Sequence, residues 1–185
     1  MKTTMKLFAA ITIMLGFSMM SKAQTADMTA TAAVVNALAV TVTQPLNFGN
    51  ILKPSGSSVT RIVALDDQAT GSATAVAGVT PKHGIFKIVK GANTNLSVTY
   101  TAIAGTLTGA GAPMAMSGYV SKCNINSTDG STGVDVSCVA LAPTSITTLT
   151  AATDIYVHIG GTVTAADAQL AGVYTGTITL QATYN

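Results

Sequence analysis

The amino-acid sequence predicts an all-β fold, an antiparallel β-sandwich of about eight strands. Three observations support this prediction. Beyond residue 23, apolar and polar residues alternate with a period of two, and the 3.6-residue period of an amphipathic helix is absent. Turn signals rich in Gly, Pro, Asn and Ser separate the alternating segments at intervals of about 10–20 residues. Antiparallel sandwiches are typically built from such segments.

The first 23 residues are predicted to be a secretory signal peptide. Lys2 and Lys6 form a basic start, residues 7–20 are mainly apolar, and small residues flank Lys22 before Gln24. We therefore expect residues 24–185 to form a single domain in the periplasm, at the cell surface or outside the cell. The apolar run is too short to span a bilayer well, so we expect no stable membrane span after cleavage. An uncleaved membrane anchor is the alternative.

The composition excludes some function classes. Charged residues make up 9% of the chain, against about 25% in an average soluble domain, and Glu and Trp are absent. Cleavage would remove three of the nine basic residues and leave six against seven Asp, a net charge of about −1. So few cations cannot form the basic surface that nucleic acids require. We expect no nucleic-acid partner.

The first alternating segment, residues 28–42, places Val34, Leu38, Val40 and Val42 on one apolar face. The strand should end at Pro45, because proline cannot donate to a ladder. Further strands are expected over residues 58–65, 85–89, 96–103, 114–121, 134–141 and 155–159.

The end of the chain carries the clearest strand. Ile178, Leu180, Ala182 and Tyr184 share one face of residues 177–184, and Thr and Gln occupy the other. The preceding strand, residues 155–159, is expected to end at Gly160. The one helix candidate, residues 165–170, would form at most a turn or two.

The two cysteines, Cys123 and Cys138, are predicted to form a disulfide, because an exported chain reaches an oxidising compartment. Residues 124–130, rich in Asn, Ser, Asp and Gly, would form the loop of a long hairpin. Metal binding by this pair is a weak alternative, since no histidine is close in sequence.

Residues that could perform acid–base or nucleophilic chemistry are scarce. His83 is expected in a turn, and His158 is expected to face solvent because it alternates with apolar neighbours. The adjacent Asp66 and Asp67 would point to opposite faces and do not resemble a glycosidase pair. Calcium binding at these carboxylates or at Asp129 is a weak alternative. We expect no catalytic residues, no metal, no cofactor and no enzymatic activity.

Local motifs near both ends of the domain resemble those of one group of secreted bacterial proteins. Residues 44–51 (QPLNFGNI) follow the first strand and carry a hydrophobic-x-Phe-Gly-x-hydrophobic step with Phe48 and Gly49 at its centre. This step resembles the pilin and spore-coat-U-like superfamily, which includes the Mat-type common pilus subunits.

The C-terminal motifs extend this resemblance. Residues 159–163 (IGGTV), followed by Gly172, Tyr174 and Gly176, resemble the closing segment of a domain of unknown function allied to that superfamily. Gly172 is fourteenth from the end and Tyr184 is penultimate, which resembles the C-terminal motif of chaperone–usher pilin subunits.

The resemblance implies an immunoglobulin-like sandwich that lacks one strand. In such pilins a periplasmic chaperone, and then the N-terminal extension of the next subunit, fills the gap by β-strand addition. The candidate groove strand is residues 173–184, with Ile178, Leu180 and Tyr184 toward the core. The candidate donor is residues 26–42, with Val34, Leu38, Val40 and Val42 entering the groove. Alternatively the N-terminal strand is resident in its own domain.

We therefore expect a structural subunit of a fimbria or cell-surface coat, which pairs with itself or with a chaperone through terminal strands. The alternative is a monomeric secreted binding module for a glycan or another surface ligand. The absence of Trp counts against that alternative, because glycan grooves usually expose large aromatic rings.

Overall fold

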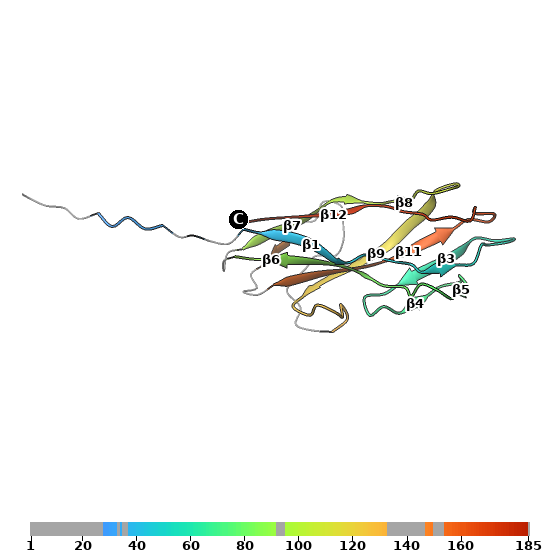
Figure 1. Ribbon diagram of the computed structural model, residues 1–185, viewed down its shortest axis with the longest axis horizontal. Coiled ribbons are helices and arrows are strands. Elements are labelled where there is room, and N and C mark those ends of the chain that lie inside the picture. Colours follow the sequence, from blue (N-terminus) through green and yellow to red (C-terminus); the bar gives the residue numbers. More distant parts are fainter. Residues whose placement is uncertain are drawn as a thin grey trace, which may run out of the picture. The chain divides into compact units, whose positions relative to one another are not determined.

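The computed structural model describes residues 28–32, 34, 37–91, 95–132, 147–149 and 154–184. The chain divides into two units, Met1–Val34 and Val35–Asn185, and each is described by itself. Every described strand lies in the second unit (Figure 1). The expected signal peptide, the expected strand over residues 134–141 and Cys138 lie outside the described residues.

The described residues form an all-β structure without a helix, and all of their strand pairs are antiparallel, which confirms the predicted class. The described residues form twelve strands, against about eight expected for the whole domain. The additional strands are pieces of two or three residues. The strands are β1 (Ala39–Gln44), β2 (Asn50–Ile51), β3 (Val59–Val63), β4 (Ala69–Thr70), β5 (Ala75–Val76), β6 (Gly84–Val89), β7 (Leu96–Ile103), β8 (Thr106–Leu107), β9 (Met114–Asn124), β10 (Thr147–Leu149), β11 (Ile155–Ala165) and β12 (Ile178–Tyr184).

The larger sheet is built around β11. It has seven strands in the order β1-β6-β11-β3-β4, and β9 pairs with both β11 and β8. The expected end of this strand at Gly160 is wrong, because β11 continues to Ala165. Strands β3 and β9 pair with the C-terminal half of β11, for example Thr162 with Ile62 and with Ser117. These two ladders give hydrogen-bond partners to the backbone N–H and C=O groups that follow Gly160, so the strand continues past it.

A three-stranded sheet, β10-β7-β12, shares a buried core with the larger sheet. Leu96 of β7, Ile88 of β6 and Ile155 of β11 are fully buried in this cluster. The alternation in β12 places Leu180 opposite Tyr100 and Tyr184 opposite Leu96. The apolar face predicted for the C-terminal strand therefore packs into the molecule.

A second buried cluster lies at the other end of the larger sheet. It contains six residues from the chain after β1 and from β3, β9 and β11: Phe48, Val63, Met114, Met116, Val163 and Ala165. Phe48, which the sequence singles out in a motif, is thus a core residue with 8% of its surface exposed.

The N-terminal strand is shorter than the sequence predicts. Residues 28–32 carry no strand, and Met28 and Val34 are 95% and 100% exposed. Strand β1 begins at Ala39, which pairs with Val89, the last residue of β6. Alternation alone does not make a strand. Strand β6 ends at Val89, and the ladder between β1 and β6 ends there too.

Two expectations near the C-terminus are also wrong. Ala165 of the helix candidate is the last residue of β11, paired with Val59, and residues 167–168 form a turn. Strand β12 begins at Ile178, and before it the segment makes one isolated bridge, between Thr175 and Thr108. In both places pairing with neighbouring strands overrides the local sequence pattern.

Candidate functional site

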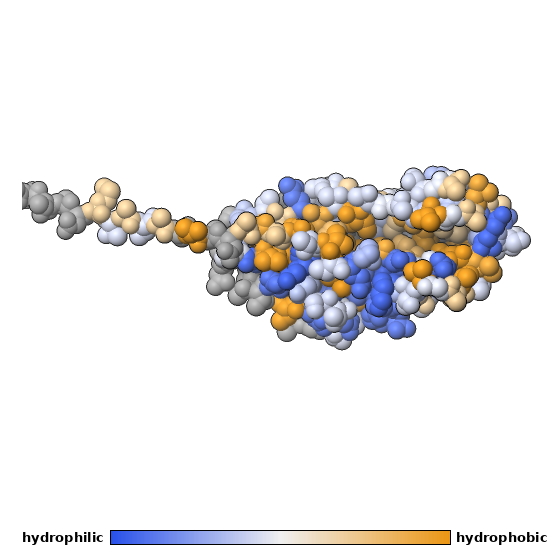
Figure 2. Space-filling view, viewed as in Figure 1, coloured by the Kyte–Doolittle hydropathy of each residue, from blue (hydrophilic) through white to orange (hydrophobic). Residues whose placement is uncertain are grey.

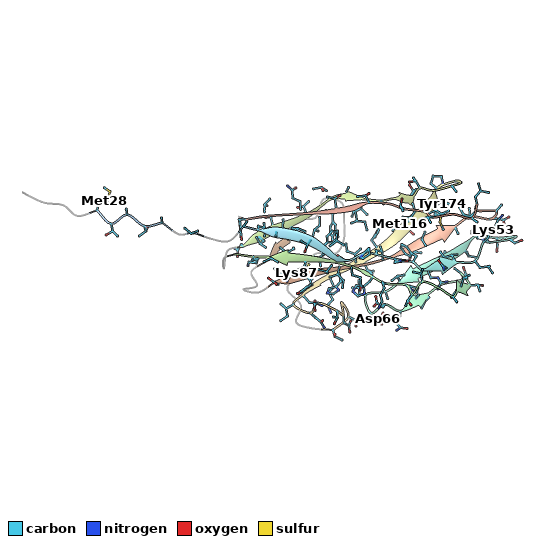
Figure 3. All side chains as sticks on the ribbon, viewed as in Figure 1. Met28, Lys53, Asp66, Lys87, Met116 and Tyr174 are labelled. Atoms are coloured by element: carbon cyan, nitrogen blue, oxygen red, sulfur yellow. The ribbon has the colours of Figure 1, made fainter. Side chains whose placement is uncertain are left out.

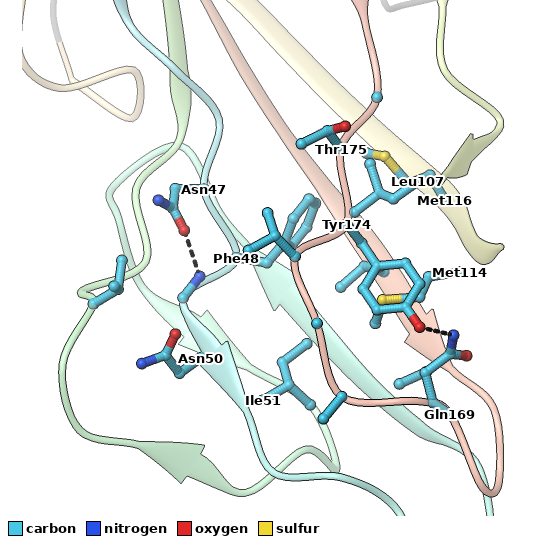
Figure 4. A pocket seen from close by; sticks show the side chains of 18 of the residues that line it. Asn47, Phe48, Asn50, Ile51, Leu107, Met114, Met116, Gln169, Tyr174 and Thr175 are labelled. Atoms are coloured by element: carbon cyan, nitrogen blue, oxygen red, sulfur yellow. Dashed lines mark hydrogen bonds between the residues drawn. The ribbon is translucent and has the colours of Figure 1, made fainter. Parts of the chain in front are cut away.

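A groove of about 770 Å³ opens in the second unit between residues 46–54, which follow β1, and residues 170–178, which lead into β12. Its floor consists of apolar residues of β8, β9 and β11, including Leu107, Met114 and Val163. Figure 4 shows the two segments together with Leu107, Met114 and Met116 of this floor. Figure 2 shows the surface hollowed here, with hydrophobic residues around the hollow.

The first rim turns away from β1 at Gly49. Its φ is +70°, and the backbone amide of Gly49 donates to Asn47 Oδ1 at 2.7 Å. A Cβ at Gly49 would lie 2.8 Å from the carbonyl oxygen of Val79, closer than Cβ atoms approach in real proteins. The turn buries Phe48 against the floor and sends the chain into β2, which pairs with β5. A residue with a side chain would strain both the turn and this contact.

The second rim is fixed by Tyr174. Its hydroxyl donates to the carbonyl oxygen of Leu170 at 2.9 Å and accepts from Gln169 Nε2 at 2.8 Å. Figure 3 places Tyr174 beside Met116 of β9. Thr175 exchanges two backbone hydrogen bonds with Thr108, of 2.8 and 2.9 Å. This rim is therefore held at its base by side-chain and backbone bonds.

The rims adjoin the open edges of the sheets. Strands β1 and β12 are each the end strand of their sheet, and β1 lies against β12. Among the described residues, β2 pairs only with β5, and the chain around Thr175 bridges only to Thr108. Two open backbone edges above an apolar floor can bind an extended peptide, whose backbone would pair while its alternate side chains are buried.

One comparison with known proteins gives a match. The family described as Domain of unknown function (DUF4402) matches residues 38–184. The chain belongs to this family. No curated protein and no solved structure matches the chain. The DUF4402 match begins at Leu38, which packs against the core.

The predicted donor residues of the DUF4402 chain fall into two groups. Leu38 and Val40 pack against their own core, and β1 pairs with β6 of the same chain. Val42 is 59% exposed and Val34 is fully exposed. The chain from Leu38 onward is therefore resident in its own domain, and only the residues before Leu38 remain as a candidate donor.

The predicted C-terminal motif divides in a similar way. Gly172, Tyr174, Gly176 and Ile178 line the groove. Leu180 is buried beyond it, packed in the core shared by the two sheets. The expected groove strand of residues 173–184 thus borders the groove over its first part only.

Of the two cysteines predicted to form a disulfide, Cys138 lies outside the described residues. Cys123 lies on β9 opposite Val157 and is 1% exposed. The disulfide remains a prediction.

Sequence reasoning missed one polar cluster. His83 and His158 are both fully buried, their ring nitrogens are 2.9 Å apart, and His83 also contacts Asp67. The expectation that His158 faces solvent is therefore wrong, although the alternation places it correctly on the face opposite Ile155 and Val157. That face is nevertheless covered by loops, which periodicity cannot indicate.

Within the part of the chain that the structure describes, no group of three or more His, Cys, Asp or Glu side chains could hold a metal ion. Over the same residues there is no helix long and apolar enough to cross a membrane.

Proposed function

We propose that the DUF4402 chain is an exported, non-enzymatic structural subunit of a fimbria or cell-surface coat. Its fold would be an immunoglobulin-like sandwich with one open seam, and its groove would receive a β-strand from another copy. The observation that carries this proposal is the apolar groove between the chain that follows β1, which includes β2, and the chain that leads into β12. A chaperone strand could occupy the same groove before assembly.

The occupant we propose is the segment of residues 28–37 of a second copy. It precedes the first resident strand, and its residues Met28, Ala30, Ala32 and Val34 share a parity opposite to Thr29 and Thr31. About ten residues in extended form span about 30 Å, the length of a long strand. One face of this segment would fill the groove, and the threonine face would remain in water.

Composition supports an assembly role. The chain has few charges, and an apolar side chain left 100% exposed, as Val34 is, is what a segment that becomes buried on assembly would carry. Full burial of Val34 would stabilise the assembled state by about 1.5–3 kcal/mol. Export would bring copies together outside the cytoplasm, where the predicted disulfide can also form.

The test compares the chain from Gln24 with two variants, Val34→Asp and Thr31→Asp. Both positions are exposed and neither lies in a described strand, so both variants should fold like the wild type. Size-exclusion chromatography and gels of unboiled samples should show heat-sensitive ladders for the wild type and for Thr31→Asp. Val34→Asp should stay monomeric, because a carboxylate would enter an apolar groove.

Two results would contradict the proposal. One is assembly of Val34→Asp equal to that of the wild type. The other is a wild-type monomer that takes up no added peptide of residues 26–37. A glycan-array signal from such a monomer would favour the alternative of a secreted binding module.

A further inference from the structure

A buried row of polar groups crosses the face of β11 that points away from the shared core. Asp67 Oδ1 is 2.6 Å from His83 Nδ1, and His83 Nε2 is 2.9 Å from His158 Nδ1. His158 Nε2 lies 2.9 Å from the carbonyl oxygen of Asn126 and 3.0 Å from Asn124 Oδ1. Both imidazoles are fully buried, so every ring nitrogen depends on these partners.

Two loops cover this row. The backbone amide of Gly130 donates to the carbonyl oxygen of Leu65 at 3.0 Å, which joins the loop after β9 to the turn after β3. A Cβ at Gly130 would lie 2.7 Å from the Cβ of His158, so the loop packs directly on that ring. Figure 3 shows Asp66, next to Asp67, on the opposite side of the second unit from Tyr174 of the groove.

One end of the row requires an N–H. The carbonyl oxygen of Asn126 can only accept a hydrogen bond. Asn124 also presents its oxygen, because its Nδ2 donates to the carbonyl oxygens of Asp129 and Thr132 at 3.2 and 2.9 Å. His158 Nε2 must therefore carry a hydrogen.

The other end also requires an N–H. Asp67 Oδ2 pairs with Lys82 Nζ at 2.5 Å, and Asp67 Oδ1 accepts the backbone amide of His83 at 2.9 Å. Burial raises the pKa of Asp67, but the bonds from Lys82 and His83 outweigh it and hold the pKa below its usual value. Because the carboxylate is ionised, His83 Nδ1 must carry a hydrogen.

The proton count then exceeds that of two neutral rings. A third hydrogen must lie between His83 Nε2 and His158 Nδ1, which makes three on four nitrogens, whereas two neutral imidazoles carry two. Burial, as the largest cause, lowers the pKa of His158. The extra proton therefore belongs on His83, beside Asp67, and His158 is neutral with its Nδ1 bare.

We propose that His83 and His158 form a proton-dependent contact. It holds the loop after β9 and the turn at Asp67 in place over the two rings only while the pair carries a single extra proton. The charged groups around it come from each packed element. They are Asp67 from the turn, Lys82 before β6, Lys122 from β9 and Asp129 from the covering loop. Removing the proton would leave one contact of the row without a hydrogen: two bare nitrogens would face each other between the rings, or one bare nitrogen would face Asp67 or the carbonyl oxygen of Asn126.

The sign of the pH dependence follows from the proton count. Above about pH 7 unfolded histidines are mostly neutral. The folded chain then holds one proton more, and stability falls as pH rises. The unfolding constant should increase up to tenfold per pH unit once the unfolded chain has released this proton. Below about pH 6.5 the unfolded chain takes up a second proton that His158 resists when folded, so stability falls there too.

The first test is nitrogen NMR of the histidine rings in the intact wild-type protein at about pH 7. We expect both nitrogens of His83 to be protonated and the Nδ1 of His158 to be bare. Two neutral rings would overturn the proposal. This readout needs no variant.

The second test compares Asp67→Asn with Asp66→Asn by denaturant unfolding from about pH 7 to about pH 9. An amide nitrogen in place of Asp67 Oδ1 can donate to a bare His83 Nδ1, which satisfies the row with two neutral rings. It cannot accept the backbone amide of His83, so the variant should lose some stability at every pH while its alkaline slope disappears. The alkaline loss of stability should therefore disappear in Asp67→Asn and persist in the wild type and in Asp66→Asn, a matched change one residue away. The same slope in Asp67→Asn and wild type, or no slope in the wild type, would overturn the proposal.

Discussion

At the scale of single residues, Gly49 shows how one backbone conformation shapes the groove. Its φ of +70° directs the chain from Phe48 into β2, and the carbonyl oxygen of Val79 lies too close to leave room for a side chain. We predict that Gly49→Ala destabilises the domain by about 1–3 kcal/mol, through left-handed strain and the contact with Val79.

Gly56→Ala is the matched control for this prediction. Gly56 also has a positive φ, of +89°, but nothing lies within 4 Å of a Cβ built there. Urea unfolding should show the smaller loss for Gly56→Ala, of about 1 kcal/mol, because only the backbone strain applies. Equal losses at the two positions would contradict the role given to the Val79 contact.

The histidines show where residue-scale reasoning from sequence stops. Parity places His158 on the correct face of β11, yet an alternating pattern cannot show that a loop from residues 125–132 covers that face. His83 and Asp67 are likewise separated from His158 along the chain and meet only in the fold. No local motif signals such a row.

At the scale of elements, most long strands were predictable, but not all of their ends were. Residues 96–103 match β7, and Pro45 ends the first strand at Gln44 as expected. The strand with Gly160 runs on to Ala165, because two neighbouring strands pair with it. Alternation reports which face is buried, whereas length depends on the partner beside the strand.

The loop between the cysteines gives a prediction at the same scale. A Cys123–Cys138 disulfide closes a loop of about 16 residues and should stabilise the domain by about 3 kcal/mol. Thermal unfolding of the exported protein should therefore shift to lower temperature in a reducing agent. The variant Cys138→Ala should be insensitive to the reducing agent. Intact mass after thiol alkylation checks the pairing, and two alkylated thiols in the untreated protein would contradict it.

At the scale of the whole molecule, the N-terminal chain has two separable parts. The described residues before Leu38, which are 28–32, 34 and 37, are exposed and carry no strand, whereas Leu38 and Val40 pack against the core and β1 pairs with β6. We predict that deleting residues 24–37 leaves the unfolding temperature within a few degrees of the wild type and abolishes assembly. Deleting residues 24–42 should destabilise the domain strongly, because β6 loses its edge partner.

Circular dichroism during heating and size-exclusion chromatography separate these two effects. A large drop in unfolding temperature for the shorter deletion would mean that the segment is resident. Unchanged assembly of that variant would mean that some other surface joins the copies.

The sequence by itself determined the class of the fold and the faces of its strands, because a period of two assigns each side chain to one side of a sheet. It also determined the scarcity of charged groups, which composition sets directly. Only the tertiary structure decided that β1 starts at Ala39, that a groove opens beside Phe48 and Tyr174, and that two histidines are buried together. These features depend on contacts between segments far apart in the chain, and local patterns do not encode such contacts.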